Sequence, residues 1–441
     1  MGRVAQTGGL QRGHKVLSNR IVSGVMSDMR IPLRCLSWCI LPTLAFAAED
    51  GLQVHRRALV LDTHFDTAVN LSIAGWDVMQ RHAWESDFTQ VDHPRLVEGG
   101  VDGGFWTLYV AQGPRTPEGH AKARDTAVAI AMRIREMVAR HPGAFALATR
   151  ADDAARIAQE GRQIVYLSME NGYPLGKDLS LLSLFHSLGV RMFGPVHLAN
   201  NELADSATDV NGPEWGGLSP LGRQLVDVCN RLGIVLDASH ASDDTLRQLI
   251  SQSAVPIVLS HSGCKAIYDH KRNVDDDLLR LLAARGGVIQ MNAFSSYIAP
   301  LLVDPARNLA LKEVLARHGG WGGLDTAEKR ERYLIARREI ERSHPAPRAS
   351  FDQFMSHVLH ALKVVGPDHV GFSGDFDGGG GVEDLMDVTG MPRITERLLA
   401  EGYAEVDIMK FWSGNVLRVL RAAEDHATRG SAPASASSPR S

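Results

Sequence analysis

The sequence predicts an α/β protein of the (β/α)8 class, a TIM-type barrel. Short apolar runs alternate with amphipathic helical segments, and eight of these runs have the character of strands. Strands that alternate with helices favour parallel pairing with right-handed crossovers, and a closed barrel needs eight of them. An open, doubly wound sheet would show the same alternation. However, no Gly-rich dinucleotide fingerprint follows the first strand, which favours the barrel.

The expected elements follow one another in a regular order. The expected strands are short, apolar and β-rich, and comprise residues 58–62, 105–110, 164–167, 190–196, 234–237, 257–259, 288–291 and 370–372. The expected helices have apolar side chains at helical spacing, and comprise residues 121–141, 221–232, 243–251, 276–284 and 351–365. Residues 293–350 form a long insertion with several Arg and Glu residues and Trp321. We expect a helical lid or flank there, before the last strand, rather than a separate domain.

Composition and charge restrict the classes of function. The 441 residues are 44% apolar and 22% charged, which is ordinary for a globular protein. The net charge is −4 and no block of Lys or Arg stands out, so we expect no nucleic-acid partner. The 18 histidines favour a metal site.

The two ends have the composition of segments outside the barrel. Arg30 and Arg34 precede an apolar run, residues 35–46, and Ala45-Phe46-Ala47 fits a signal-peptide cleavage site. We therefore expect residues 1–47 to be a leader, with translation starting at Met26 or Met29, and a periplasmic or secreted protein. The run is too short for a stable membrane span. Residues 48–424 would form the barrel, and residues 425–441, rich in Ser, Ala and Pro toward the end, a disordered tail.

Two cysteines remain after the leader, Cys229 and Cys264. One pair cannot make a disulfide framework, and neither residue belongs to a C-x-x-C motif. Buried, unpaired thiols are the favoured interpretation, although a single bridge is compatible with an oxidising compartment.

Polar residues follow the expected strands at the end where a parallel barrel places its catalytic groups. The first strand leads into His64 and Asp66, which alternate and can therefore point to one side. A lone His or Asp in such a place is more often a core or turn residue, but this pattern recurs at six strand ends. The remaining ends carry Glu170, His197, His240, His261, Asp375 and Asp377. Converging histidines and carboxylates suggest a hydrolytic centre with two metal ions.

The chemistry suggests a division of labour. Two cations about 3.5–4 Å apart need a shared anionic ligand, and the two oxygens of Glu170 suit that role. His64 and Asp66 would complete the coordination of one metal ion, and His240 and His261 that of the other. A hydroxide held between the metals would be the nucleophile.

Eight short motifs resemble those of the renal or membrane dipeptidases, the M19 peptidases of the metal-dependent amidohydrolase barrels. They occur in the family's order and comprise residues 62–66, 169–172, 188–191, 237–240, 260–262, 269–274, 374–378 and 414–419. The resemblance implies a zinc-dependent dipeptidase with two divalent ions, most suitably Zn²⁺, which cleaves free dipeptides and tolerates a D-residue at the C-terminal position. It also implies a dipeptide as the binding partner, and a homodimer is common among such proteins.

The resemblance also implies roles for single residues. The family's metal ligands match His64, Asp66, Glu170, His240 and His261. His197 matches a histidine that contacts the substrate or the tetrahedral intermediate. Arg272 matches the arginine that pairs with the substrate's terminal carboxylate, a task for which a guanidinium fork is well suited. Asp375 matches the acidic proton shuttle, and Asp377 is a weaker contender.

Three departures from the family pattern affect the pocket rather than the metal ligands. Asn171 stands where many relatives have Gly, and Pro195 and Val196 precede His197 where relatives often have Thr. A substrate-contacting Tyr of some relatives falls near Phe294, so one hydrogen bond to the substrate is in question.

Two other functions remain open on the sequence. One is a different amidohydrolase on the same barrel, such as a deacylase or lactonase; many of those use a carboxylated lysine as the bridging ligand, and Glu170 argues against it. The other is a non-catalytic periplasmic protein that binds a peptide-like ligand, against which the intact acid at Asp375 argues.

Overall fold

Eight parallel strands form the centre of the protein, as the sequence predicts. The computed structural model describes residues 51–431, which belong to one compact unit. One sheet has the order β1-β2-β4-β5-β6 and the other the order β10-β9-β7-β8. Single parallel bridges join Phe65 to Phe376 and Asp237 to Val258, so β1 meets β10, β6 meets β7, and the ring closes. The eight barrel strands are β1 (Leu61–Phe65), β2 (Gly103–Tyr109), β4 (Gln163–Glu170), β5 (Val190–Phe193), β6 (Val235–Leu236), β7 (Val258–Cys264), β9 (Val288–Asn292) and β10 (Val370–Ser373).

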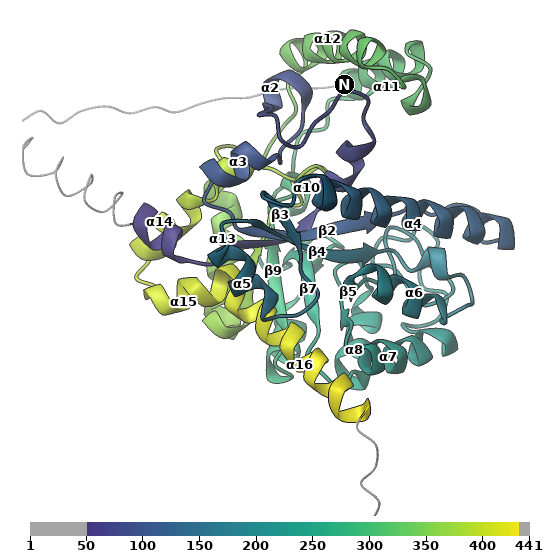
Figure 1. Ribbon diagram of the computed structural model, residues 1–441, viewed down its shortest axis with the longest axis vertical. Helices are drawn as coiled ribbons and strands as arrows, with labels where there is room; N and C mark the ends of the chain where they lie inside the picture. Colours follow the sequence, from purple (N-terminus) through teal and green to yellow (C-terminus); the bar gives the residue numbers. More distant parts are fainter. Residues whose placement is uncertain (1–50, 432–441) are drawn as a thin grey trace, which may run out of the picture. The chain divides into compact units, whose positions relative to one another are not determined.

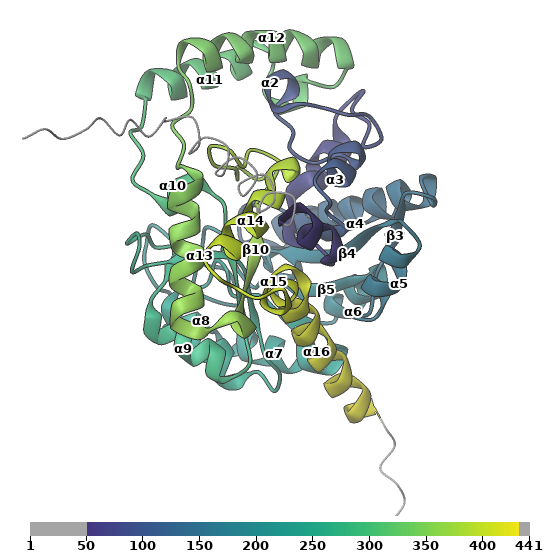
Figure 2. The same ribbon diagram turned by 90° about the vertical axis from the view of Figure 1, so that its left-hand side faces the viewer.

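The barrel strands are apolar because both of their faces are covered. Every residue of β1, β4, β7, β9 and β10 is buried, as expected for parallel strands packed between a barrel interior and a helical layer. Figures 1 and 2 show the helices around the strands. The surrounding helices are α4 (Pro117–Arg140), α5 (Asp153–Gln159), α6 (Leu181–Leu188), α7 (Pro220–Leu232), α8 (Asp243–Gln252), α9 (Asp276–Ala284), α13 (Phe351–Val365), α14 (Pro392–Ala400), α15 (Glu405–Met409) and α16 (Asn415–Ser431).

Side-chain caps fix where several of these helices begin. Thr116, Ser219, Ser242, Asp275 and Ser350 each accept a hydrogen bond from a backbone N–H of the first turn of α4, α7, α8, α9 and α13, respectively. Such a bond satisfies one of the donors that a helix start leaves unpaired. The caps therefore set the points at which the loops from the strand ends become helix.

All eight expected strands are present, with shifted bounds. The first strand begins and ends later than expected, because Thr63 and His64 belong to it despite being polar. Two short strands were not expected: β3 (Phe145–Leu147) pairs with β4, and β8 (Asn273–Val274) pairs with β7. Both Cys229 and Cys264 are buried free thiols, in agreement with the favoured interpretation.

The expectation for the C-terminal tail is wrong in part. The last helix, α16, continues to Ser431, so residues 425–431 are helical although they were assigned to a disordered tail. The rest of that segment and the expected leader, residues 1–47, lie outside the described residues.

The insertion before β10 is helical and packs beside the barrel. It contains α10 (Ser295–Ile298), α11 (Pro305–Arg317) and α12 (Ala327–Ser343), and in Figures 1 and 2 α11 and α12 lie next to α2 (Trp84–Asp87). A small apolar cluster of Phe88, Val314, Tyr333, Leu334 and Ile340 holds this layer together. The short helix α3 (His93–Glu98) follows α2 along the chain.

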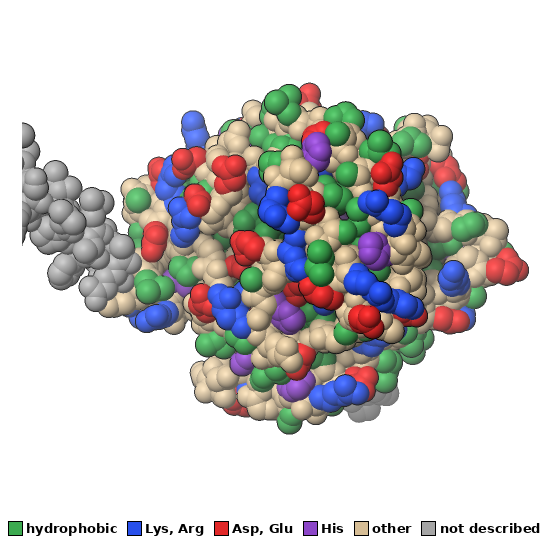
Figure 3. Space-filling view, turned by 90° about the horizontal axis from the view of Figure 1, so that it is seen from above, with side chains coloured by type: hydrophobic (Ala, Val, Ile, Leu, Met, Phe, Trp, Pro, Cys, Tyr) green, Lys and Arg blue, Asp and Glu red, His purple; other side chains and the backbone are tan. Residues whose placement is uncertain are grey.

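The surface seen from above, on the side of α11 and α12, carries basic and acidic side chains interspersed with apolar ones (Figure 3). Within residues 51–431, no helix combines the length and the apolar character needed to cross a bilayer.

Candidate metal centre

The polar residues predicted from the strand ends meet in one cavity at the C-terminal ends of the barrel strands, here called the mouth. His64 and His261 lie within β1 and β7, and Glu170 ends β4. Asp66 is the first residue of the 3-10 helix η1 (Asp66–Ser72), not the last of a strand. His197, His240 and Asp375 follow the ends of β5, β6 and β10. The cavity has a volume of about 350 Å³ and is lined by these residues together with Val69, Tyr109, Leu198, Phe294, Tyr297, Asp377 and Gly378.

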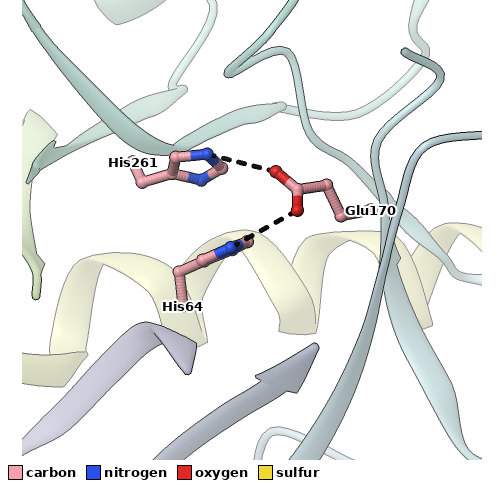
Figure 4. Close-up of side chains that lie close together, drawn as sticks. All are labelled: His64, Glu170 and His261. Carbon is pink, nitrogen blue, oxygen red and sulfur yellow. Dashed lines mark ion pairs between the residues drawn. The ribbon is translucent and has the colours of Figure 1, made fainter. Parts of the chain in front are cut away.

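Glu170 lies between the histidines, with its two oxygens directed to different rings (Figure 4). Its Oε2 is 3.7 Å from His64 Nε2, and its Oε1 is 3.3 Å from His261 Nε2. His240 Nε2 approaches the same Oε1 at 2.9 Å. One carboxylate therefore faces two sets of nitrogen donors, which is the geometry of a bridging ligand.

Three overlapping groups in the mouth bring potential ligand atoms together. In each group the atoms lie within 4.8 Å of one another, and the groups are His64 with Glu170 and His261, Glu170 with His197 and His240, and His64 with Asp66 and Asp375. Because Glu170 and His64 each occur twice, proximity alone does not divide the ligands between two ions. His197 and Asp375 are near enough to act as ligands, in addition to the five expected ones.

Two buried polar atoms without hydrogen-bond partners also suggest that these residues bind a divalent metal. Among the described residues, Asp66 Oδ1 and His240 Nδ1 are buried without a hydrogen bond. The Nε2 atoms of His240 and His261 are 2.9 Å apart. Buried polar groups are normally satisfied, and imidazole and carboxylate donors suit Zn²⁺ and similar ions.

The electrostatics of the mouth reflect an excess of buried carboxylates. Burial raises the pKa of Glu170 to about 8, against the opposing charge of His64. Burial also raises the pKa of Asp375. Burial opposes protonation of His64, but the carboxylates of Glu170 and Asp66 raise its pKa to about 10. Divalent cations in this position would compensate these negative charges.

The other histidines of the mouth are kept neutral. Burial and the nearby Arg272 guanidinium lower the pKa of His197 to about 3. Burial also holds the pKa values of His240 and His261 well below the ordinary value. A neutral imidazole has a free lone pair, which is the form that binds a metal.

A hydrogen-bonded chain orients His261. Ser260 Oγ donates to Asp237 Oδ2 at 2.6 Å, so it accepts from His261 Nδ1, which lies 2.8 Å away. The proton is thereby placed on Nδ1, and Nε2 keeps its lone pair toward Glu170. This role of Asp237 and Ser260 is not predicted from the sequence, although both residues belong to the motifs that resemble those of the family.

The two aspartates after β10 differ in their surroundings. Asn292 Nδ2 donates to Asp375 Oδ2 at 2.9 Å, and Asp375 belongs to a group of potential ligand atoms. Asp377 instead accepts from Thr67 Oγ1 at 2.6 Å and from the backbone N–H of Gln90 at 2.8 Å. Asp377 is therefore satisfied by the protein, and Asp375 is the better candidate for the chemistry.

Arg272 lies behind the cavity rather than in its lining. Its side chain is buried, and its Nη1 and Nη2 atoms donate to the backbone carbonyls of Ser239 and His261. Its guanidinium carbon is 5.3 Å from the centroid of the Tyr297 ring, which does line the cavity. The structure thus places Arg272 near the site, with Tyr297 beside it.

Aromatic side chains complete the wall. Phe294 and Tyr297 stack with ring centroids 4.3 Å apart, and Tyr109 packs edge-on against His197. Tyr109 and Tyr297 were not predicted, because an aromatic residue near a strand end carries no signal that separates the mouth from the core.

A larger cavity of about 1110 Å³ opens elsewhere, beside the beginnings of α4 and α7. Its lining includes none of the residues that surround Glu170. Cavity size therefore does not locate the site, whereas the convergence of histidines and carboxylates does.

Comparison with known proteins agrees with this arrangement. Residues 49–434 match the family model of membrane dipeptidase, peptidase family M19. A dipeptidase, tcpJ, of Claviceps purpurea is 31% identical over 347 residues, which cover 76% of this chain and 69% of that protein. The dipeptidase aclJ of Aspergillus oryzae is 29% identical, covering 83% of this chain and 79% of its own.

Solved structures give the same result. The probable dipeptidase PvdM of Pseudomonas aeruginosa is 31% identical with a TM-score of 0.73, covering 87% of this chain and all of its own. The metallopeptidase dipeptidase AC is 26% identical with a TM-score of 0.66, covering 83% of this chain and 98% of its own. The family match spans all of the described residues and therefore includes every residue of the mouth. The chain belongs to the membrane dipeptidases, the metallopeptidase family M19.

Proposed function

We propose that the protein is a zinc-dependent dipeptidase that hydrolyses free dipeptides and accepts a D-residue at the C-terminal position. The observation that carries this proposal is the position of Glu170, whose two oxygens face His64 on one side and His240 and His261 on the other. His64 and Asp66 would hold one ion with Glu170, and His240 and His261 the other. When bound, two such ions supply an activated water and a Lewis acid for the peptide carbonyl.

The chain's own residues supply the remaining steps. Asp375, buried at the mouth, would take the proton of the attacking water and deliver it to the leaving amine. Its raised pKa suits this exchange, because an acid that titrates nearer neutral pH can both accept and donate. His197 is neutral and lines the cavity, so an N–H of its ring can donate to the developing oxyanion.

Arg272 is proposed to recognise the substrate's terminal carboxylate together with Tyr297. Because its guanidinium already donates to two backbone carbonyls, direct contact requires one of those bonds to open. If both hydrogen bonds stay intact, the guanidinium would attract the carboxylate electrostatically from behind Tyr297, without direct contact.

The experiment that tests the function uses the protein purified without its leader. Bound metal would be measured, and hydrolysis of L-Ala-L-Ala and L-Ala-D-Ala followed with and without a chelator. We expect about two ions per chain and chelator-sensitive cleavage of both substrates. Two ions with neither substrate cleaved would instead favour a deacylase, a lactonase or a peptide-binding protein on the same barrel.

Export to the periplasm or medium, as residues 35–46 suggest, and a homodimer are further proposals. Cell fractionation checks the first. The second is checked by the mass of the purified protein in solution.

A further inference from the structure

The turn after β10 has a conformation that its own sequence does not favour. Asp375 and Asp377 have φ values of 52° and 67°, in the left-handed region. That region is uncommon for residues other than Gly, and such residues keep it only where the surroundings determine the conformation. The groups that hold this turn therefore also decide where Asp375 lies.

Gln90, between α2 and α3, makes four hydrogen bonds to this turn and the segment that follows it. It is 1% exposed. Its Oε1 accepts from the backbone N–H of Asp377 at 2.8 Å, and its own backbone N–H donates to Asp377 Oδ1 at 2.8 Å. Its Nε2 donates to the carbonyls of Gly380 at 3.0 Å and Met386 at 2.6 Å. The side chain thus uses both of its N–H donors and one acceptor site of Oε1 on this turn and the segment that follows it.

The backbone of the turn is packed directly against two carboxylates of the mouth. A Cβ on Gly378 would lie 1.9 Å from Asp66 Oδ2 and 2.7 Å from Asp375 Oδ1. Any side chain at this position would force one of the two carboxylates to move. Because no free space separates the turn from the carboxylates, a displacement of the turn would be passed to Asp66 and Asp375.

The segment that carries Gln90 is itself held by the insertion. Arg338 of α12 donates to the carbonyl of Ser86 at 2.7 Å, and the guanidinium of Arg337 lies 3.8 Å from the centroid of the Phe88 ring. A chain of contacts therefore runs from α12 through residues 86–90 to the turn after β10.

We propose that Gln90 is a positioning residue for Asp375, which acts by fixing the turn of residues 374–381 against the mouth. This inference rests on the proposed function, in which Asp375 transfers the proton. The proposal also implies a function for the insertion, because α12 holds the segment that carries Gln90.

The test compares two variants that each remove a buried amide bonded to two backbone carbonyls near β10. Gln90→Met keeps the length of the side chain and removes its hydrogen bonds at the mouth. Asn415→Ala is the control, because Asn415 Nδ2 donates to the carbonyls of Pro367 and Val370 at the opposite end of the strand.

In Gln90→Met we expect kcat for dipeptide hydrolysis to fall about 10–100-fold, as for groups that orient a catalytic residue. KM should change by about twofold or less, because substrate binding is not the step affected. Metal content, measured at saturating metal, should be unchanged, because Asp66 is only one of the proposed ligands and the others do not contact the turn. In Asn415→Ala we expect a lower Tm with kcat at the wild-type value.

A second measurement does not depend on activity. Amide hydrogen exchange of peptides covering residues 374–381 should be faster in Gln90→Met and unchanged in Asn415→Ala. If Gln90→Met does not fold, Gln90→Asn, which keeps the amide but is one methylene shorter, should show the same changes in kcat and in exchange.

The outcomes distinguish a failure of the role proposed for Gln90 from a failure of the proposed dipeptidase function. A folded, metal-loaded Gln90 variant with wild-type kcat and wild-type exchange overturns the role of Gln90. A wild-type protein that binds metal but cleaves no dipeptide overturns the proposed function, and exchange at residues 374–381 then still decides whether Gln90 holds the turn.

Discussion

Two sets of buried histidines use their ring nitrogens in opposite ways. In the wall of the protein, His357 Nδ1 accepts from the backbone N–H of Cys264 and its Nε2 donates to the carbonyl of Ile298, each at 3.0 Å. His55 is similarly bonded to Thr395 at 2.8 Å and to the carbonyl of Gly99 at 2.9 Å. At the mouth, His240 and His261 point their Nε2 atoms at each other and at Glu170.

The difference shows that burial does not distinguish a functional histidine from a structural one. All four rings are buried and neutral, and burial lowers the pKa of both wall histidines to about 4. The mouth differs because the Nε2 atoms of His240 and His261 converge on one point beside Glu170 instead of each bonding to a separate backbone group, and such convergence is what a metal site requires. Variants at each set should therefore affect different properties.

The largest effect is expected from Glu170→Gln. The change removes the charge that the two sets of mouth nitrogens share, so bound metal should be lost. Activity should fall by more than about 100-fold, because even residues that only support a metal ligand contribute about 10–100-fold. Metal analysis and dipeptide hydrolysis on the same preparation check this. A fully metallated, fully active variant would show that Glu170 is not a shared ligand.

Asp375→Asn should separate proton transfer from metal binding. We expect kcat to fall about 10²–10⁴-fold, the usual contribution of a general acid or base, with metal content unchanged. Steady-state kinetics and metal analysis are the measurements. Loss of metal together with activity would assign Asp375 to the ligands, with His64 and Asp66.

Arg272→Ala should mainly raise KM for dipeptides with a free carboxylate. A lost charge-assisted hydrogen bond of about 1.5–3 kcal/mol corresponds to roughly 10–100-fold. C-terminally amidated dipeptides should be little affected. Arg191→Ala is a matched control, because Arg191 donates to the carbonyls of Thr149, His186 and Val190 outside the mouth.

Equal losses on free and amidated substrates would give Arg272 a different role. It would then act by holding the Ser239 and His261 carbonyls, and through them the strand ends that carry the ligands.

The smallest effect on activity, and a clear effect on stability, is expected from His357→Gln. The folded-state pKa of His357 is about 4, below its ordinary value of about 6.5 in the unfolded chain. The unfolded state therefore takes up the proton first, and stability is lost as the pH falls from about 6.5 toward 4.

The variant lacks this loss, so its free energy of unfolding should approach or pass that of the wild type at low pH. Between pH 7 and pH 4, the difference in free energy of unfolding between the two proteins should change by up to about 3 kcal/mol. Urea denaturation of both proteins at pH 7 and near pH 4, in chelator, measures it. A constant difference between the two proteins would mean that folding does not lower the pKa of His357.

Much of the barrel and of the mouth could be predicted from the sequence, for a physical reason. Parallel strands are apolar on both faces, so they stand out, and the polar residue that ends each of them is conspicuous. The bounds were less accurate where ligands belong to the strand itself. His261 lies inside β7, where a polar residue resembles a strand end.

The supporting residues could not be predicted. Gln90 bonds to Asp377, which is 287 positions away, and no local pattern encodes such a pair. Asp237 and Ser260 lie at expected strand ends and in the family-like motifs, but nothing local in the sequence shows that they bond to each other and to His261. β3 and β8 were missed because runs of three and two residues carry no measurable period.

The way in which the two sheets of the barrel join affects how a bound metal would contribute to stability. Continuous pairing joins the strands within each sheet, whereas single bridges join β1 to β10 and β6 to β7, at positions here called the seams. His240 and His261 stand on opposite sides of one seam, and Asp66 and Asp375 on opposite sides of the other. In the proposed enzyme the ion held by His240 and His261 would be bound from both sheets, so bound metal would add to the contacts that join them, and its removal should lower the free energy of unfolding.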